Sequence, residues 1–200
     1  MVKDGIPFVL VPAAAMAVFA LSQLWIPAVI FLLLTAFMIY FFRDPDRVVP
    51  TDSGLIVSAA DGRVTRIEST DEHKLVSVFL SPFDVHVNRS PIAGKVVDIT
   101  YVKGKKMPAT SDIASLENER NSLVIEGENL TVTCTQIAGI LARRIVCWTK
   151  AGDNLERGQR FGLIKFGSRT DLLMPPNVDI VVRVGDTVRG GETIIAKLRT

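Results

Sequence analysis

The 200-residue sequence has few of the residues that build metal sites and disulfide scaffolds. It contains two cysteines and two histidines, too few for a disulfide-stapled fold or for most zinc hydrolases. Cys134 and Cys147 lie in strand-like runs, and we expect them to be small buried apolar residues. Charge of one dominant sign is also lacking, with 23 basic residues against 21 acidic ones. We therefore expect no nucleic-acid partner, because such binding needs a broad basic surface.

Apolar residues, in contrast, make up 48% of the chain and gather in one stretch. Residues 6–42 contain no charged side chain. One helix of that length would measure about 55 Å, whereas the hydrocarbon core of a bilayer is about 30 Å thick. Two helices broken near residues 22–27 would fit, with Pro27 in the first turn of the second helix. The sequence predicts a membrane helical hairpin over residues 1–42.

The charges that follow the hairpin indicate its orientation. Arg43 and Arg47 come directly after the second apolar segment, and basic residues favour the cytoplasmic side of a membrane. A hairpin that only dips into one leaflet would explain the same residues. A signal peptide is disfavoured, because the apolar run is too long and no small-residue cleavage site follows it. We expect residues 43–200 to lie at the cytoplasmic face of the cell (inner) membrane.

The remainder of the chain has the pattern of a mainly β fold. Short β-branched runs alternate with glycines, and only residues 112–121 show helical periodicity. Two units also repeat: residues 60–67 resemble residues 92–99, and the Gly-Asp unit at residues 152–159 returns at residues 185–192. A Gly-Asp pair of this kind indicates a tight turn between strands.

These repeats predict the architecture of residues 43–200. Paired units of glycine, strand and Gly-Asp turn indicate an antiparallel β-barrel or sandwich, similar to the hybrid barrel of biotinyl and lipoyl carrier domains. A carrier domain would present a lysine at a hairpin tip, usually beside a methionine. Lys150 lies near a turn but lacks that context, and we interpret it as a surface residue.

A polar segment at residues 81–91 carries the histidine best placed for chemistry. In a strand, Asp84, His86 and Asn88 would share one face, because side chains alternate with a period of two. A histidine on such a polar face suits acid–base work near neutral pH. His73 lies in a polar turn, and we assign it no catalytic role.

Two further polar positions lie beside apolar runs. Asp61 starts a strand-like run, where an aspartate most often caps a turn. Gly167 and Ser168 follow the apolar run at residues 161–165, and Gly-Ser pairs usually mark ordinary turns. Serine, histidine and aspartate are the parts of a nucleophilic triad if the fold brings them together. The spacing of these residues leaves that question open.

Taken in order, these segments give the chain a resemblance to the short, membrane-associated phosphatidylserine decarboxylases. The resemblance covers nearly the whole chain. It rests on the apolar hairpin, FFRDPDR at 41–47, ADG at 60–62, SPFDVHVNRSP at 81–91, ENERN at 117–121 and FGSR at 166–169. None of these motifs is specific alone, whereas their combination and order are.

The resemblance implies a proenzyme that cleaves its own chain between Gly167 and Ser168. The products would be a β chain of residues 1–167 and an α chain of residues 168–200, held together as a heterodimer that could assemble further. The resemblance also implies that Ser168 becomes a pyruvoyl group, with no metal and no pyridoxal phosphate. Strands at residues 178–184 and 193–198 would keep the α chain bound without a covalent link.

The activity implied is decarboxylation of phosphatidylserine to phosphatidylethanolamine and CO₂, so the partners would be a phospholipid and the membrane. In the same resemblance, the base for self-cleavage is a histidine oriented by an aspartate. This sequence offers His86 and Asp61 for these catalytic roles. The membrane hairpin would keep the domain where the lipid head group lies.

The chain departs from the longer bacterial members at two places. Those members have a second histidine three positions after the first, where this chain has Arg89, so its role would pass to His86 or be performed in another way. They read Leu-Gly-Ser-Thr at the cleavage site, where this chain has Arg169 after the serine. Arg169 is a candidate to bind the anionic head group because of its charge, and Asn88 is a second candidate substrate contact.

Two alternatives remain open. A non-enzymatic membrane-anchored barrel, such as a carrier-like subunit or a transport adaptor, would account for the hairpin and the Gly-Asp repeats but not for Gly167-Ser168. Within the enzyme class, the substrate could instead be an archaeal-type ether lipid or another serine lipid, because nothing in the sequence reads the acyl chains. Intactness of the purified chain separates the enzyme from the non-enzymatic barrel.

Overall fold

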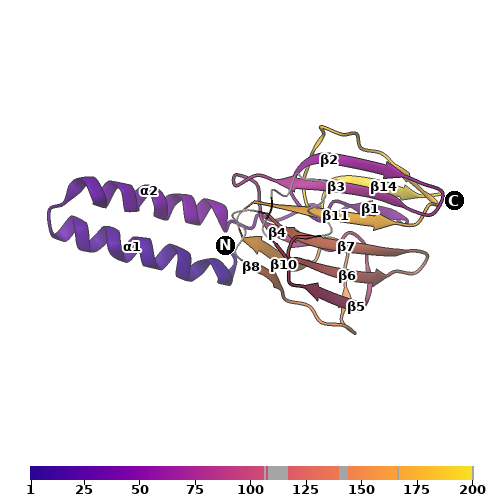
Figure 1. Cartoon of the computed structure of the whole chain (residues 1–200), viewed down its shortest axis with the longest axis horizontal. Helices are drawn as coiled ribbons and strands as arrows, with labels where there is room; N and C mark the ends of the chain where they lie inside the picture. Colours follow the sequence, from indigo (N-terminus) through magenta and orange to yellow (C-terminus); the bar gives the residue numbers. More distant parts are fainter. Residues whose placement is uncertain (106, 108–116, 140–143, 166, 200) are drawn as a thin grey trace. The chain divides into compact units, whose positions relative to one another are not determined.

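The computed structural model describes residues 1–105, 107, 117–139, 144–165 and 167–199. The chain divides into two compact units, residues 1–46 and residues 47–200. The first unit is helical and the second is built from β-strands (Figure 1).

The first unit is the helix pair that the uncharged sequence predicts. Its elements are the 3-10 turn η1 (Lys3–Gly5) and the helices α1 (Ile6–Leu21) and α2 (Trp25–Phe41). In the turn between the helices, Gln23 has a φ of 59°. Phe19 stacks on Phe31 near this turn, with ring centroids 5.5 Å apart. At the other end, the Val2 N–H donates to the carbonyl of Phe42 (3.1 Å), so the helices form an antiparallel hairpin (Figure 1).

Large apolar side chains of the helix pair face outward. Leu21 is 85% exposed, Ile26 79% and Val11 70%, although a helix of a water-soluble protein buries its apolar face. The helical segment Lys3–Leu21 is long and apolar enough to cross a membrane, and α2 is an apolar helix of 17 residues. The helix pair is therefore a candidate membrane anchor.

The second unit contains the following strands among the described residues: β1 (Leu55–Val57), β2 (Gly62–Ser69), β3 (Lys74–Leu80), β4 (Val87–Arg89), β5 (Gly94–Val102), β6 (Arg120–Glu126), β7 (Thr131–Ala138), β8 (Arg144–Cys147), β9 (Asn154–Leu155), β10 (Arg160–Lys165), β11 (Ser168–Met174), β12 (Val178–Ile180), β13 (Thr187–Val188) and β14 (Ile194–Leu198). All pairings between these strands are antiparallel. The predicted mainly β domain is thus confirmed.

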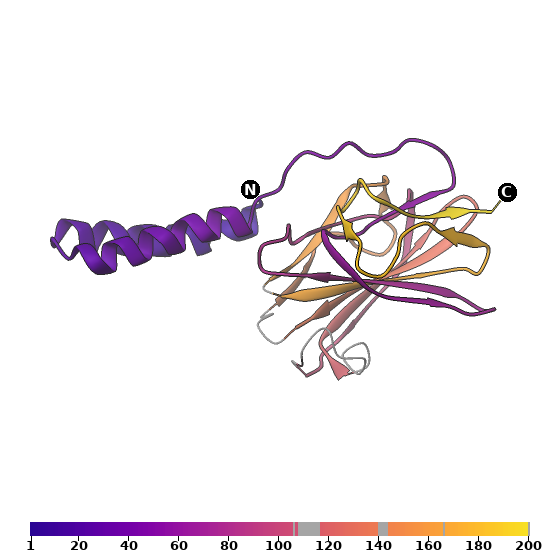
Figure 2. The same cartoon turned by 90° about the horizontal axis from the view of Figure 1, so that it is seen from above.

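Three sheets are formed by these strands. The largest has the order β13-β2-β3-β11-β7-β6-β5-β9 and curls into a half-barrel, and the smaller ones have the orders β4-β10-β8 and β1-β14-β12 (Figure 1). Seen from above, the C-terminal strand β14, in yellow, lies across the interior from the purple and orange strands of the large sheet (Figure 2). The interior is therefore enclosed between sheets.

The internal repeat predicted from the sequence is present as two matching turns. Gly152 and Gly185 have φ values of 98° and 99°, in the left-handed region that favours glycine. In each turn, the aspartate after the glycine accepts a 2.8 Å hydrogen bond from the backbone N–H three residues earlier. The two glycines donate their N–H groups to the carbonyls of Val96 (2.7 Å) and Val64 (2.8 Å), which occupy equivalent positions in the other repeated unit.

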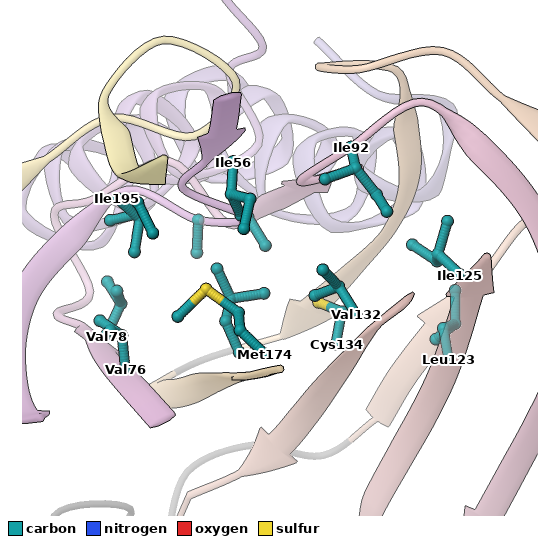
Figure 3. Close-up of a cluster of buried hydrophobic side chains, with 14 of the residues drawn as sticks. Ile56, Val76, Val78, Ile92, Leu123, Ile125, Val132, Cys134, Met174 and Ile195 are labelled. Carbon is teal, nitrogen blue, oxygen red and sulfur yellow. The ribbon is translucent and has the colours of Figure 1, made fainter. Parts of the chain in front are cut away.

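The hydrophobic core fills the space between the sheets. Figure 3 shows Ile56 and Ile195, from β1 and β14, facing Val76, Val78 and Met174 of the large sheet. Every one of these side chains is at most 2% exposed. Burying a side chain of this size contributes about 1.5–3 kcal/mol, so the core fixes which face of the large sheet points inward.

Two expected elements differ from the structure. The strand predicted over residues 178–184 ends at Ile180, and the last predicted strand residues belong to the Gly-Asp turn, in which Asp186 accepts a hydrogen bond from the N–H of Arg183. The helical window at residues 112–121 begins outside the described residues, and its last two residues, Arg120 and Asn121, belong to strand β6.

Candidate active site

Ser168 is the first residue of β11, a central strand of the large sheet. It pairs with Leu80 of β3 on one side and with Ala138 of β7 on the other. Its side chain is fully buried, and its Oγ has no hydrogen-bond partner among the described residues. Buried polar groups are nearly always hydrogen-bonded. An unbonded, buried hydroxyl is therefore a candidate for chemistry.

The peptide bond before Ser168 has an unusual setting. Gly167 has a φ of 62°, which L-residues with a side chain rarely adopt. Among the described residues other than its chain neighbours, no atom lies within 4 Å of where a Cβ would be, so the backbone conformation is what favours glycine here. The Gly167 carbonyl accepts a hydrogen bond from the Gly139 N–H (3.1 Å). A donor at this position would stabilise negative charge developing on that oxygen.

His86 lies just before strand β4 and is 2% exposed. Its Nδ1 lies 2.9 Å from the backbone carbonyl oxygen of Asp84. In the neutral ring, an Nδ1–H that donates to this carbonyl leaves Nε2 as the basic nitrogen. The backbone of Asp84 thus fixes the ring in the tautomer that a general base needs.

The expectation that Asp84 shares a strand face with His86 and Asn88 is wrong. Strand β4 starts at Val87, and Asp84 lies in a turn. Its Oδ2 accepts hydrogen bonds from the backbone N–H and the hydroxyl of Ser81, both at 2.7 Å. An aspartate that caps a turn in this way competes with strand pairing, which explains why the strand begins later.

A buried polar network joins β4 to the large sheet. Asn88 donates from Nδ2 to the Thr170 hydroxyl (3.3 Å) and accepts at Oδ1 from Gln136 Nε2 (2.9 Å). Gln136 in turn accepts from Asn121 Nδ2 (3.0 Å). All four side chains are at most 3% exposed. Thr170, Gln136 and Asn121 are direct neighbours in the register of β11, β7 and β6.

This network bears on the relation between His86 and Ser168. Asn88 and Thr170, which are in contact, lie two residues after His86 and Ser168 in their segments. Ser168 and Thr170 both belong to β11, so their side chains point to the same face of the sheet. The network therefore sets the register between the segment that carries the histidine and the strand that carries the serine.

Asp61 lies at the start of β2 and is bound by charged and backbone donors. The Arg47 Nη2 atom is 2.9 Å from Oδ1 and 2.8 Å from Oδ2, and the Gly190 N–H donates to Oδ1 (2.8 Å). Burial is the main influence on the pKa of Asp61 and raises it; the Gly190 and Arg47 donors act in the opposite direction, and the negative charge of Asp84 adds to the rise. The Ala59 carbonyl accepts the Arg89 N–H (2.9 Å), so the segment leading to Asp61 lies beside β4.

The two predicted substrate contacts are both buried. Arg169 is 3% exposed, and its Nε is 2.8 Å from Oδ1 of Asp171. Because adjacent residues of a strand face opposite ways, Arg169 points to the side of the sheet away from Ser168. Asn88 is fully buried within the network described above. Phe166, the first residue of the FGSR motif, lies outside the described residues.

The remaining side chains considered from the sequence have ordinary environments. His73 lies in the turn between β2 and β3, with Nδ1 3.4 Å from the Thr70 hydroxyl. Cys134 is buried and Cys147 is half-buried, and both are free. Within the described ranges, no group of three or more histidine, cysteine or acidic side chains is arranged to hold a metal ion.

Sequence reasoning missed four residues of this site: Arg47, Gly139, Gln136 and Thr170. Arg47 follows an apolar segment and lies in the FFRDPDR motif, and neither feature indicates its contact with Asp61. Gln136 and Thr170 do carry a signal, since they occupy core-facing positions of alternating strands, where a polar side chain is unexpected. Gly139 acts through its backbone N–H, which leaves no signature in the residue type.

Comparison with known proteins shows the class of this protein. A family model described as phosphatidylserine decarboxylase matches residues 34–196. Among similar curated proteins, the phosphatidylserine decarboxylase proenzyme of Nitratidesulfovibrio vulgaris is 47% identical over 97% of this chain and 93% of its own length. The proenzymes of Symbiobacterium thermophilum and Geotalea uraniireducens are 46% and 43% identical, each over 98% of this chain and over 94% and 95% of their own lengths.

The fold and the site, with these matches, define a carboxy-lyase of the kind that is made as a precursor. The matches run over nearly the full length of both partners. The chain belongs to the phosphatidylserine decarboxylase family.

Proposed function

We propose that this chain is made as a proenzyme, cleaves itself between Gly167 and Ser168, and then decarboxylates phosphatidylserine to phosphatidylethanolamine and CO₂ in phospholipid biosynthesis. Membership of the family supports the reaction. The observation that carries the position of cleavage is the buried, unbonded Ser168 hydroxyl next to a glycine in the left-handed region. The cofactor is a pyruvoyl group derived from Ser168.

The first step of self-cleavage converts an amide into an ester. Ser168 Oγ attacks the carbonyl carbon of Gly167, the new C–O bond forms, and the C–N bond to Ser168 breaks. The hydroxyl proton passes to His86, the base in this proposal, which returns a proton to the departing nitrogen. The Gly139 N–H stabilises the negative charge on the Gly167 oxygen. Asp61 supports the protonated histidine.

The second step separates the two chains. Removal of the Cα proton of residue 168 breaks the Cβ–Oγ bond, and Gly167 leaves as a carboxylate at the end of the 1–167 chain. The dehydroalanine that remains takes up water and loses ammonia, which leaves a pyruvoyl group at the start of the 168–200 chain. Atoms balance with one water consumed and one ammonia released. No metal and no pyridoxal phosphate enter this scheme.

The residues around Ser168 fit such a group. A pyruvoyl group lacks the amine and the hydroxyl of serine, so a buried position with no hydrogen-bond partner at Oγ loses little when the group forms. The pyruvoyl carbonyl supplies an electron sink for the electron pair that CO₂ leaves behind. His86 then delivers a proton to the substrate Cα. Arg169 and Asn88 stay predictions as substrate contacts, since both side chains are bound within the chain.

We further propose that the two product chains stay together as a heterodimer without a covalent link. Strand β11 lies between β3 and β7 and pairs with them along its length. β14 pairs with β1, and β13 pairs with β2. Three strands of the α chain are thus held by strands of the β chain, and assembly beyond this heterodimer stays a prediction.

The helix pair anchors the enzyme at the cell (inner) membrane in this proposal, with the β domain on the cytoplasmic side. The Arg43 guanidinium lies over the Tyr40 ring, 3.7 Å from its centroid, at the end of α2, where aromatic and basic residues typically meet a membrane interface. Arg47 is bound by Asp61 and Glu192. The argument from positive charge for orientation therefore rests on Arg43.

The likeness of the β domain to the biotinyl and lipoyl hybrid barrel is also a proposal. It is supported by the two Gly-Asp turns, whose glycines have φ values within one degree of each other and whose aspartates cap the same backbone position. A shared ancestry of two such units would explain why the carbonyls of two equivalent valines, Val96 and Val64, accept the hydrogen bonds from the two turn glycines.

Intact-mass spectrometry of the full-length chain tests the proposed function. We expect two fragments from the natural sequence, with the 168–200 fragment lighter by one ammonia than a peptide that begins with serine. Ser168→Ala should stay intact. Ser77→Ala is a matched control, because Ser77 is also a fully buried serine of the large sheet whose Oγ has no partner among the described residues, and it should cleave normally.

An intact 200-residue natural chain that is well folded would contradict this proposal and favour the non-enzymatic anchored barrel. If cleavage occurs, release of CO₂ from phosphatidylserine vesicles checks the substrate. A parallel assay with an ether-linked serine lipid distinguishes the alternative substrate class. Loss of cleavage in the Ser77→Ala control would show that a generally weakened sheet, rather than loss of the nucleophile, explains the Ser168→Ala result.

A further inference from the structure

Arg47 forms ion pairs with two acidic residues beside the candidate site, Asp61 and Glu192. Its side chain is 6% exposed. Its Nη2 atom donates to both oxygens of Asp61 at 2.8 and 2.9 Å, and its Nη1 atom donates to Glu192 (3.3 Å). One guanidinium nitrogen of Arg47 thus contacts both oxygens of Asp61 while a second nitrogen contacts Glu192, so the planar guanidinium is held by two carboxylates and in turn limits how the Asp61 carboxylate can rotate.

Apart from Arg47, Asp61 is influenced by one neutral hydrogen-bond donor and one negatively charged side chain. The Gly190 N–H is a neutral donor to Oδ1, and Asp84 contributes a repelling negative charge. Glu192 accepts from Arg47 and from the Val48 N–H (3.0 Å), and Arg189 lies 3.8 Å from it. Among the described residues, Arg47 is the cation that contacts Asp61 directly.

We infer that Arg47 is a positioning residue for self-cleavage, which holds the Asp61 carboxylate in one orientation and as an anion. This inference rests on the proposed role of Asp61. It goes beyond that role because it assigns a function to a residue in the segment between the helix pair and the first strand of the β domain. The ion pair spans 14 residues in sequence, and the contact with Glu192 spans 145.

The physical argument follows from the balance of effects on Asp61. Burial and the charge of Asp84 raise the pKa of Asp61, and Arg47 and the Gly190 N–H oppose this rise. Without Arg47, one of the two opposing influences is lost, so the pKa rises further and the carboxylate is protonated at a higher pH. An uncharged Asp61 would no longer stabilise a protonated histidine. Self-cleavage should then need a higher pH.

The experiment measures self-cleavage of the full chain as a function of pH. The chain is made by cell-free translation, and the conversion to fragments is followed on gels between pH 6 and pH 9. For Arg47→Met we expect cleavage about tenfold slower at pH 6.5, with a deficit that shrinks as the pH rises. Arg47→Lys keeps the charge, but its single nitrogen cannot replace the two guanidinium nitrogens that contact Asp61 and Glu192, so its profile should lie between those of the natural chain and Arg47→Met.

Arg157→Met is the matched control. Arg157 Nη1 donates to the backbone carbonyls of Pro50 and Asp52, both at 2.8 Å, so it ties down the same segment as Arg47 without contacting Asp61. We expect its pH profile to match that of the natural sequence. An unchanged profile for Arg47→Met would overturn the inference, and so would an equal, pH-independent slowing in Arg47→Met and Arg157→Met.

Asp61→Asn separates this inference from the proposed function. If Asp61→Asn cleaves at the natural rate at every pH, the assignment of Asp61 in the proposed mechanism is wrong, and the inference is overturned with it. If Asp61→Asn is slow at every pH while Arg47→Met keeps the natural profile, the role of Asp61 stands and only the inference about Arg47 is overturned.

Discussion

Two neighbouring rows of side chains on the inner face of the large sheet use the same three strands for different purposes. The apolar row consists of Leu172, Cys134 and Leu123, and the polar row of Thr170, Gln136 and Asn121. Every member of either row is at most 3% exposed. The two rows lie on the same three strands of one sheet and are equally buried. They therefore differ in the chemistry of their side chains.

The comparison teaches that burial by itself does not reveal what a position contributes. The apolar row stabilises the fold through the hydrophobic effect, which has no direction. The polar row stabilises less, because its hydrogen bonds mainly replace bonds to water. What the polar row adds is direction: each bond ties one strand to the next, and Asn88 extends the row to the segment of His86. The row next to Ser168 is the polar one.

The largest effect should come from a change in the apolar row. Leu172→Ala leaves a cavity in the core and should lower the free energy of unfolding by about 3 kcal/mol. Guanidinium unfolding in the Ser168→Ala background, where the chain is expected to stay intact, measures this. The cleavage rate of the folded Leu172→Ala chain should stay within about twofold of natural, since the row does not set the site. A large loss of cleavage in the folded variant would remove the distinction between the rows.

Asn88→Leu breaks the polar row at its link to β4. The variant loses the 2.9 Å acceptor of Gln136 Nε2 and the donor to Thr170, so we expect the segment of His86 to shift relative to the strand of Ser168. Self-cleavage should slow by about 100-fold, as is typical when a catalytic group is displaced. The measurement is the half-time of fragment formation on gels. A melting curve in the Ser168→Ala background shows whether the fold is retained, and normal cleavage in a folded Asn88→Leu chain would contradict this account.

The smallest effect should come from a single atom of the polar row. Thr170→Val keeps the shape of the side chain but removes the hydroxyl that accepts from Asn88, and we expect cleavage about tenfold slower. Thr170→Ser keeps the hydroxyl and loses a methyl group, so it should cleave at nearly the natural rate. If serine and valine slow cleavage equally, packing rather than the hydrogen bond explains the effect.

The sequence predicted those parts of the molecule that depend on local pattern. The uncharged run predicted the helix pair, because its length exceeds one membrane span, and the repeated Gly-Asp pairs predicted two turns that the structure shows in matching conformations. The turn at Asp84 was missed for a local reason, since a capping aspartate and a strand residue occur in the same alternating pattern.

The site was predictable only in part. The resemblance proposed Ser168, His86 and Asp61 as the catalytic residues, and the structure adds the contacts around each of them, while their roles stay predictions. The contacts involved join residues far apart, such as Asn88 with Thr170, 82 positions away, and Arg47 with Glu192, 145 positions away. Such pairs leave no period in the sequence, because each partner is fixed by the packing of sheets that are themselves assembled from distant strands.

The central place of β11 in the large sheet has a consequence for the life of the molecule. Refolding of the unprocessed chain is a unimolecular reaction, because all of its strands belong to one polypeptide. If the chain is cleaved before Ser168 as proposed, β11 belongs to a separate short peptide, so refolding requires two molecules to associate and depends on their concentration. Under dilute conditions, unfolding of the cleaved protein would then be irreversible, whereas unfolding of the uncleaved chain would be reversible.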